Sequence, residues 1–303
     1  MEALLRFDDR VAVVTGGGRG LGRAHALLLA ARGAKVVVNN PTVDPGIQVV
    51  EEIVSSGGEA VVDHSDVSVS EQAEAIIQKA IDVFGRVDIL VNNAGIAGDN
   101  EFGTTSLELF ERFWRINAAG HFNVARAAWP HMKSRGYGRI INTTSGAGIY
   151  GIPTFTAYGS SKGAINGLTR ALALEGQPLG ILVNAISPGA LTRQTEHILT
   201  NEPARAAQWL EMRSELVSPA VAWLAHESCT SNGEIYEVFA GRIARVLLAE
   251  TKGLFHPELT PELIRDNQHL LADEEGYFVP ENARDVGAFA SENRVLAKSS
   301  GEE

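Results

Sequence analysis

Short runs of apolar, β-branched residues alternate along the chain with segments whose apolar residues recur at helical spacing. The runs predict seven strands, at Val11–Thr15, Lys35–Asn39, Ala60–Asp63, Val87–Val91, Arg139–Ser145, Ile181–Ser187 and Ile235–Phe239. Helical spacing begins after the first run, and Gly33 ends that first helix. Strands that alternate with helices in this way predict an α/β fold, with a single doubly wound, mostly parallel sheet of seven strands flanked by helices.

Two sequence patterns indicate where later helices begin. Ser68 and Glu71 form a capping box for a helix that runs to about Phe84. Thr105 and Glu108 form a second, before a long helix that carries Asn117 and reaches about Met132. A further helix is expected over Ala157–Leu174.

The character of the chain changes near Gly253. We expect residues 1–252 to form one nucleotide-binding and catalytic domain. Residues 253–303 are expected to form a C-terminal helical extension of the same domain, with one helix after Thr260-Pro261 and a frayed, polar end over Ser291–Glu303.

Composition narrows the function classes. The chain has 303 residues, of which 45% are hydrophobic, so it can bury a sizeable core. Its net charge of -11 argues against a nucleic-acid surface. The lone Cys229 excludes an internal disulfide, fits a reducing compartment and is expected to be a small core side chain. The eight histidines lack metal-ligand spacing, so no metal site is expected.

The lengths of the apolar stretches and the first residues of the chain indicate its localisation. No apolar stretch approaches the ~20 residues that span a bilayer, and the first residues lack the pattern of a signal peptide. We therefore expect a cytoplasmic protein without membrane association.

A glycine-rich turn directly follows the first predicted strand and opens a helix. It reads Thr15-Gly16-Gly17-Gly18-Arg19-Gly20-Leu21-Gly22. A phosphate can lie there against free N–H groups at the positive end of the helix dipole. The turn lacks the Gly-Lys-Ser/Thr of a P-loop, which argues against an NTPase. We predict that Gly16, Arg19, Gly20, Leu21 and Gly22 bind a dinucleotide.

The end of the second strand distinguishes NAD from NADP, because a carboxylate there bonds the ribose hydroxyls and repels a 2′-phosphate. This chain has Asn39-Asn40 instead. Asn40 can bond a ribose hydroxyl but does not repel phosphate, and Arg19 could either reach a 2′-phosphate or be solvated. We expect NAD or NADP, with NAD slightly favoured.

Four polar residues suggest the chemistry. Tyr158 and Lys162 are four residues apart and share a helix face, and Ser145 lies at the end of the preceding strand, where doubly wound sheets bind ligands. A free tyrosine titrates near ~10, and a neighbouring ammonium is expected to lower that pKa. Tyr158 would then exchange a proton with an alcohol oxygen, which Ser145 would also bond. Asn117 could hold a water that links Lys162 to solvent.

With Asn92-Asn93-Ala94-Gly95 and Pro188-Gly189, these motifs resemble the short-chain dehydrogenase/reductase family over residues ~6–245. The resemblance implies a Rossmann-like fold and a catalytic tetrad of Asn117, Ser145, Tyr158 and Lys162. It also implies a homodimer or homotetramer built on the long helices around Asn117 and Tyr158. The further cofactor-binding residues that it implies are Asp66, Val67, Asn93, Ala94, Gly95, Pro188, Gly189, Leu191 and Thr192.

Other segments resemble the (3R)-hydroxyacyl-CoA dehydrogenase units of type 2 peroxisomal multifunctional enzymes, which are also described as 17β-hydroxysteroid dehydrogenases. These segments are Ala127–Trp129, Gly148–Gly151, His226–Cys229, Glu237–Gly241, His256-Pro257 and Thr260–Glu262. The resemblance implies an acyl-CoA or steroid substrate, as in lipid metabolism. We expect a free-standing dehydrogenase, because the hydratase and sterol-carrier domains of such enzymes have no counterpart in this chain.

Three interpretations follow. The first is an NAD(P)-dependent oxidoreductase that interconverts a secondary alcohol and a ketone in a 3-hydroxyacyl-CoA or a hydroxysteroid. The second is a ketoreductase for another bulky hydrophobic ketone, and the third is a dinucleotide-binding regulator without turnover. Leu191–Met212 is either a substrate lid or an ordinary pair of surface helices.

Overall fold

The computed structural model describes residues 4–192 and 209–293. By its contacts the chain divides into two compact units, Met1–Arg245 and Val246–Glu303. The division lies close to the change of character expected near Gly253, and each unit is described by itself.

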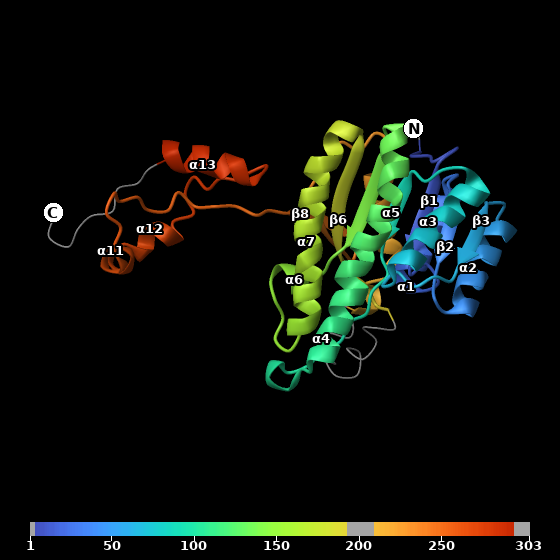
Figure 1. Cartoon of the computed structure of the whole chain (residues 1–303), viewed down its shortest axis with the longest axis horizontal. Coiled ribbons are helices and arrows are strands. Elements are labelled where there is room, and N and C mark those ends of the chain that lie inside the picture. Colours follow the sequence, from blue (N-terminus) through green and yellow to red (C-terminus); the bar gives the residue numbers. More distant parts are fainter. Residues whose placement is uncertain (1–3, 193–208, 294–303) are drawn as a thin grey trace. The chain divides into compact units, whose positions relative to one another are not determined.

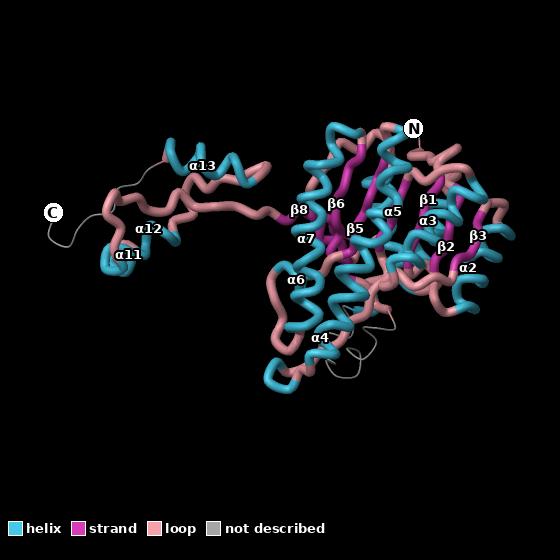
Figure 2. The backbone as a smooth tube through the Cα atoms, viewed as in Figure 1, coloured by secondary structure: helices cyan, strands magenta, loops and turns pink. Residues whose placement is uncertain are grey.

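The first unit is built around a sheet whose strands lie between layers of helices (Figures 1 and 2). The strands are β1 (Val11–Thr15), β2 (Lys35–Asn39), β3 (Ala60–Asp63), β4 (Ile89–Asn92), β5 (Gly138–Thr143), β6 (Ile181–Gly189), β7 (Ile235–Phe239) and β8 (Arg242–Val246). The larger helices are α1 (Gly20–Ala31), α2 (Val43–Ser55), α3 (Ser70–Phe84), α4 (Leu107–Phe113), α5 (Gly120–Arg135), α7 (Thr156–Gly176) and α10 (Ser218–Ala225). The short helices are η1 (Phe102–Thr104), η2 (Trp114–Ala119), α6 (Gly146–Ile149), η3 (Gln177–Leu179) and η4 (Ser214–Leu216).

The strand order is β3-β2-β1-β4-β5-β6-β7-β8, with parallel pairing from β3 through β7. The chain crosses over between β3 and β4, so the sheet is doubly wound, as predicted. The prediction of seven strands omitted β8, which directly follows a turn at Ala240-Gly241. Its residues alternate between exposed and half-buried, and it therefore lacks the continuous apolar run of a central strand.

Both faces of the sheet are covered. One core cluster packs α1, α2 and α10 on residues such as Val14, Val38 and Ile141. The other packs α3, α5 and α7 on Val13, Val37 and Ile140. Neighbouring strand residues point to opposite faces, so a buried parallel strand must be apolar on both. Cys229 lies in the first cluster and is 3% exposed, as expected of a small core side chain.

Two predicted helix starts were wrong. The helix expected from Ser68 has Val69 at its N-cap, and no side chain caps it. Ser68 instead donates its backbone N–H to Asp66 Oδ1. In the second case Ser106, one residue after Thr105, accepts the capping hydrogen bond from Leu109 at 3.2 Å.

The long helix expected around Asn117 is continuous but not uniform. It begins as α4, widens into the π-helical segment η2 and continues as α5 to Arg135. A π segment lengthens the hydrogen-bonded turn by one residue and often marks a functional site. Asn117 lies within it.

The second unit contains α11 (Pro261–Asp266), α12 (Gln268–Ala272) and α13 (Ala283–Glu292). The Thr260 side chain caps α11, in agreement with the helix expected after Thr260-Pro261. A bridge between Glu250 and Phe278 and a stacked pair of Phe278 and Phe289 hold the unit together. Among the described helices of both units, none is long and apolar enough to cross a membrane.

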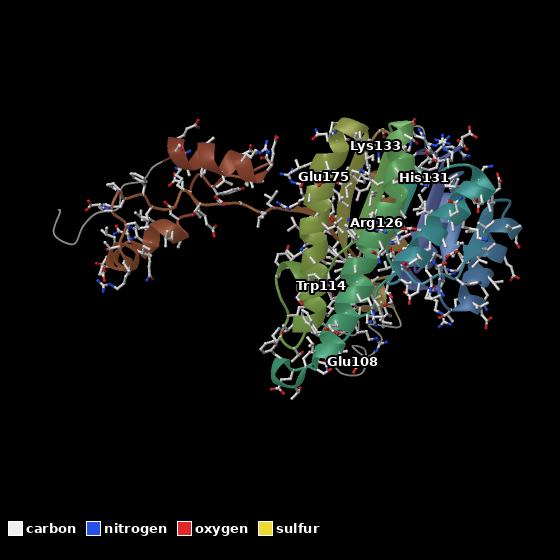
Figure 3. The ribbon with its side chains drawn as sticks, viewed as in Figure 1. Glu108, Trp114, Arg126, His131, Lys133 and Glu175 are labelled. Carbon is white, nitrogen blue, oxygen red and sulfur yellow. The ribbon has the colours of Figure 1, made fainter. Side chains whose placement is uncertain are left out.

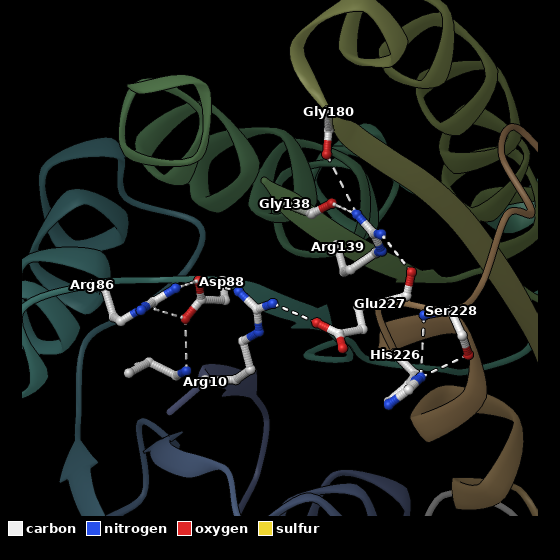
Figure 4. Close-up of polar contacts among 10 residues, drawn as sticks. Arg10, Arg86, Asp88, Gly138, Arg139, Gly180, His226, Glu227 and Ser228 are labelled. Carbon is white, nitrogen blue, oxygen red and sulfur yellow. Dashed lines mark hydrogen bonds and ion pairs between the residues drawn. The ribbon is translucent and has the colours of Figure 1, made fainter. Parts of the chain in front are cut away.

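The amino ends of the central strands carry a charged network (Figure 4). The fully buried Asp88 carboxylate accepts from the Val11 backbone N–H at 2.9 Å and from the Arg86 guanidinium at 2.7 and 2.6 Å. Arg10 lies 3.7 Å from the same carboxylate and donates to Glu227 at 2.7 Å. The contacts join residues that precede β1 and β4 to the segment after α10.

Arg139 completes this network. Its guanidinium stacks over the Tyr137 ring at 4.5 Å and donates to the carbonyl oxygens of Gly138 and Glu227 at 2.9 and 3.4 Å. Arg10 also lies over the Tyr137 ring, at 4.0 Å. Burial lowers the pKa of Arg139.

Candidate active site

Ser145 stands two residues beyond β5, at the carboxyl end of the sheet. Its extended backbone, with φ of -161°, makes it the N-cap of α6, and its hydroxyl accepts from the Ala147 N–H at 3.2 Å. The same side chain lies close enough to the Tyr158 phenol to lower the pKa of that group. The structure therefore brings together the two hydroxyl groups that the sequence placed at this edge.

Tyr158 lies in the first turn of α7, between two aromatic rings. Phe113 and Phe155 meet its ring edge-on, at centroid distances of 6.1 and 6.0 Å. Burial raises the pKa of Tyr158, and the Ser145 side chain offsets only part of that effect. The expected lowering of this pKa by Lys162 is thus not seen in this structure, because burial dominates and Lys162 makes a different contact.

Lys162 is 4% exposed, and its Nζ donates to the main-chain carbonyl of Thr143 at 2.8 Å. Burial lowers its pKa to about 7, because a charged ammonium loses hydration there. A lysine that titrates near neutral pH can change its charge in the range where enzymes commonly work.

Asn117 is fully buried in η2. Its Oδ1 accepts from the Ile96 N–H at 2.8 Å, and its Nδ2 donates to the Ile96 carbonyl at 3.0 Å and to Ser161 Oγ at 3.0 Å. These bonds tie the loop after β4 to α7. A Cβ added at Gly95 would lie 3.0 Å from Asn117 Oδ1 and 3.4 Å from Lys162 Nζ, so both groups face Gly95.

The glycine turn closely approaches the rest of the site. Gly16 has a φ of +63°, and a Cβ there would lie 2.9 Å from Ala94 Cα. A Cβ at Gly22 would collide with the Gly16 carbonyl. Arg19 is the N-cap of α1, and its exposed side chain makes no capping bond to the N–H groups of the first turn.

Asn93 and Ala94 brace this turn. Thr15 Oγ1 accepts from the backbone N–H groups of both, each at 3.0 Å. The Asn93 amide also donates to the Thr15 carbonyl at 3.0 Å and the Gly16 carbonyl at 3.3 Å. The Asn93 amide nitrogen is therefore committed to shaping the turn.

Asn40 lies over the same turn from β2. Its Nδ2 donates to the Thr42 carbonyl at 2.6 Å. A Cβ added at Gly18 would lie 3.0 Å from Asn40 Oδ1, so this oxygen faces the glycine turn. The Thr42 carbonyl can only accept, and this fixes which end of the amide carries the oxygen.

The remaining predicted cofactor residues lie around this edge. Asp66 follows β3, and its Oδ1 accepts from the Ser68 N–H at 2.8 Å. Val67 is 6% exposed and packs close to Gly120. A Cβ on Gly20 would lie 3.3 Å from Thr192 Cγ2, which brings the segment after β6 to the glycine turn.

Within that last segment, Pro188 and Gly189 end β6, and Leu191 donates its N–H to the Met212 carbonyl at 2.6 Å. A Cβ on Gly189 would lie 2.8 Å from Phe239 Cβ, which explains why glycine is needed there. Most of the expected lid lies at 193–208, outside the described residues.

These features fit a dinucleotide. Glycines stand where β1, the glycine turn and the loop after β4 meet, so no side chain fills the space there. The uncapped N–H groups of α1 face the turn. Among the residues that the structure describes, no group of three or more His, Cys, Asp or Glu side chains could hold a metal ion.

The model of the short-chain dehydrogenase family matches residues 10–203. The chain belongs to this family. It is therefore an enzyme of the oxidoreductase class, and members of the family use NAD or NADP.

One relative and two solved structures place the chain within the short-chain dehydrogenases. It is 42% identical to peroxisomal multifunctional enzyme type 2 of Mus musculus, over 90% of this chain and 38% of that protein. The structure of the full-length Drosophila melanogaster enzyme of the same name matches with a TM-score of 0.79 and 36% identity, over 95% of this chain and 50% of that one. A 7α-hydroxysteroid dehydrogenase complexed with NADH and 7-oxo glycochenodeoxycholic acid matches with a TM-score of 0.74 and 33% identity, over 78% of this chain and 95% of that one. The chain thus spans half or less of the length of the two multifunctional enzymes.

Sequence reasoning missed three residues of the site. Thr143 holds Lys162 through a main-chain carbonyl, which no side-chain motif can reveal. Ser161 lies inside the Tyr158–Lys162 motif, and its link to Asn117 crosses between helices. His121 lies four residues after Asn117, and that helical spacing was its only signal.

Proposed function

We propose that the chain is an NAD-dependent short-chain dehydrogenase that interconverts a secondary alcohol and a ketone in a 3-hydroxyacyl-CoA or a hydroxysteroid. The observation that carries this proposal is the placement of Ser145 beside the Tyr158 phenol at the carboxyl end of β5, with the buried Lys162 one helical turn away. Two hydroxyl groups at that edge suit a single oxygen atom that gains or loses a proton.

Each residue then has one task. In reduction, the protonated phenol of Tyr158, which the raised pKa favours, gives its proton to the carbonyl oxygen; in oxidation, the phenolate form takes the proton of the substrate hydroxyl. Ser145 Oγ donates a hydrogen bond to the same oxygen as its charge develops. Lys162 supplies a titratable positive charge within the site, and Asn117 fixes the loop after β4 against α7. A bound nicotinamide dinucleotide supplies the hydride acceptor or donor.

Asn40 supports NAD as the preferred cofactor. Its amide nitrogen is occupied by the Thr42 carbonyl, so the group that it turns toward Gly18 is an oxygen, which can only accept. A ribose hydroxyl can donate to this oxygen, whereas a 2′-phosphate cannot. Asn40 therefore resembles the carboxylate of NAD-dependent dinucleotide sites in hydrogen bonding, although it lacks the charge.

Apolar groups near Tyr158 support a bulky hydrophobic substrate. Phe113 and Phe155 border the phenol, and Tyr150 and Ile152, in the segment between α6 and α7, are 66% and 49% exposed. A ketoreductase for a different bulky ketone remains the second candidate on the same observation.

The test is the initial rate of absorbance change at 340 nm. NAD and NADP are each paired with a medium-chain (3R)-hydroxyacyl-CoA and with 7α- and 17β-hydroxysteroids. We expect turnover with NAD and one substrate class, and Asn40→Asp should raise the NAD-to-NADP ratio of kcat/KM by about tenfold. Binding of NADH without turnover of any of these alcohols would contradict the substrate proposal.

We further propose that α4, η2 and α5 pair with a second copy of the chain. A shallow groove there is lined by Phe110, Glu111, Trp114, Arg115 and Ala119. Trp114 and Phe122 are 45% and 47% exposed, more than is usual for large apolar side chains. Figure 3 labels Trp114. Light scattering should give a dimer or tetramer, and Trp114→Glu should dissociate it.

A further inference from the structure

His121 is a buried imidazole that no sequence motif singled out. It lies in the first turn of α5, four residues after Asn117, and is 2% exposed. Its Nε2 lies 3.5 Å from the backbone nitrogen of Thr143, the residue whose carbonyl holds Lys162. Its own main-chain carbonyl accepts from Asn92 Nδ2 at 3.1 Å. His121 thus stands where β4, β5 and α5 meet behind the lysine.

The surroundings of His121 keep it uncharged. Burial lowers its pKa well below the usual value, and the Lys162 ammonium lowers it further. The main-chain carbonyls of Asn92 and Asn117 act in the opposite direction on this pKa, but they do not compensate. Lys162 is the charged group that acts on His121 from the neighbouring elements, and the groups at the ends of β4 and β5 are neutral amides and hydroxyls.

The pocket around His121 is polar and incompletely paired. Asn92 Nδ2 also donates to Asn142 Oδ1 at 3.1 Å, and Asn142 Nδ2 donates to Thr169 Oγ1 at 3.0 Å. Asn92 Oδ1 and Thr143 Oγ1 are buried without a hydrogen-bond partner in the described part of the chain. Buried polar groups of this kind cost stability, and an apolar core would avoid the cost, so their presence beside Lys162 calls for an explanation.

We propose that His121 is a positioning residue of the active site, whose imidazole holds the main chain of Thr143 in the arrangement that the Lys162 ammonium requires. The Asn117 carbonyl, one helical turn before His121, raises the pKa of the ring, and Asn117 is tied to α7 through Ser161. It also contacts Thr143, to which Lys162 is bonded. One ring therefore connects the residue that anchors the loop after β4 with the residue that anchors the lysine.

The inference rests on the proposed role of Lys162, so its test measures that lysine in the protein without cofactor or substrate. His121→Gln and His121→Met are matched in shape, but only glutamine keeps a donor and an acceptor. The pKa of Lys162 is measured by NMR on protein with carbon-13 at the lysine ε-position, and the Lys162 signal is assigned by its loss in Lys162→Arg.

We expect His121→Met to lower the pKa of Lys162 by at least about half a pH unit, because the ammonium loses polar surroundings and a fixed carbonyl. In His121→Gln, the pKa of Lys162 should stay close to its wild-type value. An unchanged or raised pKa in His121→Met, or equal changes in both variants, would overturn the proposal. If His121→Met does not fold, His121→Ala replaces it, because a cavity distorts the strands less than a misplaced side chain.

His25 provides the control. It is also a buried histidine, 1% exposed, and burial lowers its pKa to about 3. It bonds Ser218 Oγ at 2.8 Å, between α1 and α10 and on the other face of the sheet. His25→Gln should leave the pKa of Lys162 unchanged, so a shift there would show that any buried histidine affects the lysine. The failure of every alcohol to turn over would contradict the proposed function and leave this measurement intact.

Discussion

The two ends of the parallel sheet use buried charge in opposite ways. At the amino end, the buried Asp88 meets two arginines and a backbone N–H, so its carboxylate is fully paired (Figure 4). At the carboxyl end, Lys162 is equally buried but bonds only a neutral carbonyl, and its pKa falls to about 7. The charge of Asp88 at the amino end is paired, which favours stability, whereas the charge of Lys162 at the carboxyl end is left poorly compensated, as chemistry requires. Variants at the two ends should therefore separate activity from stability.

Ser145→Ala is expected to cause a large loss of catalysis with a small loss of stability. Removing the hydroxyl that bonds the reacting oxygen should lower kcat about 10²- to 10³-fold, because a preorganised donor is lost. The Ser145 side chain also caps α6, so the free energy of unfolding should fall by about 1 kcal/mol. Urea unfolding and initial rates measure the two quantities, and retention of most activity would contradict the assigned role.

Asp88→Asn should have the opposite effect, a large loss of stability with little change in kcat. The amide cannot pair with Arg86 as the carboxylate does, and the arginine side chains are 23 and 26% exposed, so water partly relieves the loss. We expect a loss of about 2 to 3 kcal/mol in the free energy of unfolding. Because the site lies at the other end of the strands, kcat should remain within about twofold. A large fall in kcat with unchanged stability would break the contrast between the ends.

Lys162→Met should abolish activity yet stabilise the protein without cofactor at pH 7. The folded-state pKa of Lys162, about 7, lies below the usual 10.5, so between these values the unfolded chain binds more protons. Stability of the wild type should therefore rise with pH across this window, and it should be lowest where the lysine is protonated in both states. We expect a gain of about 2 kcal/mol at pH 7 in the variant.

Urea unfolding at pH 7, 8 and 9 tests whether the stability of the wild type rises with pH. The free energy of unfolding of the wild type should rise more steeply with pH than that of Lys162→Met. Parallel curves would mean that the lysine titrates normally in the folded protein.

The smallest effect is expected at the rim of the amino-end network. Glu227→Gln removes the partner of Arg10, but the glutamate side chain is 63% exposed, so solvent already screens the pair. The free energy of unfolding should change by less than about 1 kcal/mol. A loss as large as that of Asp88→Asn would show that the network acts as a unit rather than through its buried carboxylate.

The sequence predicted the strands better than the details of the site. Buried parallel strands have a composition that sequence alone can reveal, and β1, β2, β3 and β7 begin and end where expected. The strand β8 was missed because it lacks the continuous apolar run of a central strand. The cap of α4 was misplaced because one polar residue, Ser106, can replace its neighbour as a cap. The residues of the site were found by motif and order.

The sequence could not predict which groups surround each side chain of the site. The pKa of Tyr158 was expected to fall beside Lys162, but Phe113 and Phe155 bury the phenol, and the lysine bonds Thr143. All three of these neighbours lie outside the α7 motif, and the lysine's partner is a backbone atom. His121 likewise acquires its significance only from the strands packed against it.

The most direct test of the account is Tyr158→Phe, measured three ways on one preparation: kcat, NADH binding by fluorescence, and urea unfolding. The account predicts a fall in kcat of about 10²- to 10⁴-fold, with NADH affinity and unfolding free energy close to those of the wild type. Turnover within tenfold of the wild type would contradict it, because the proton would then move through some other group than the phenol.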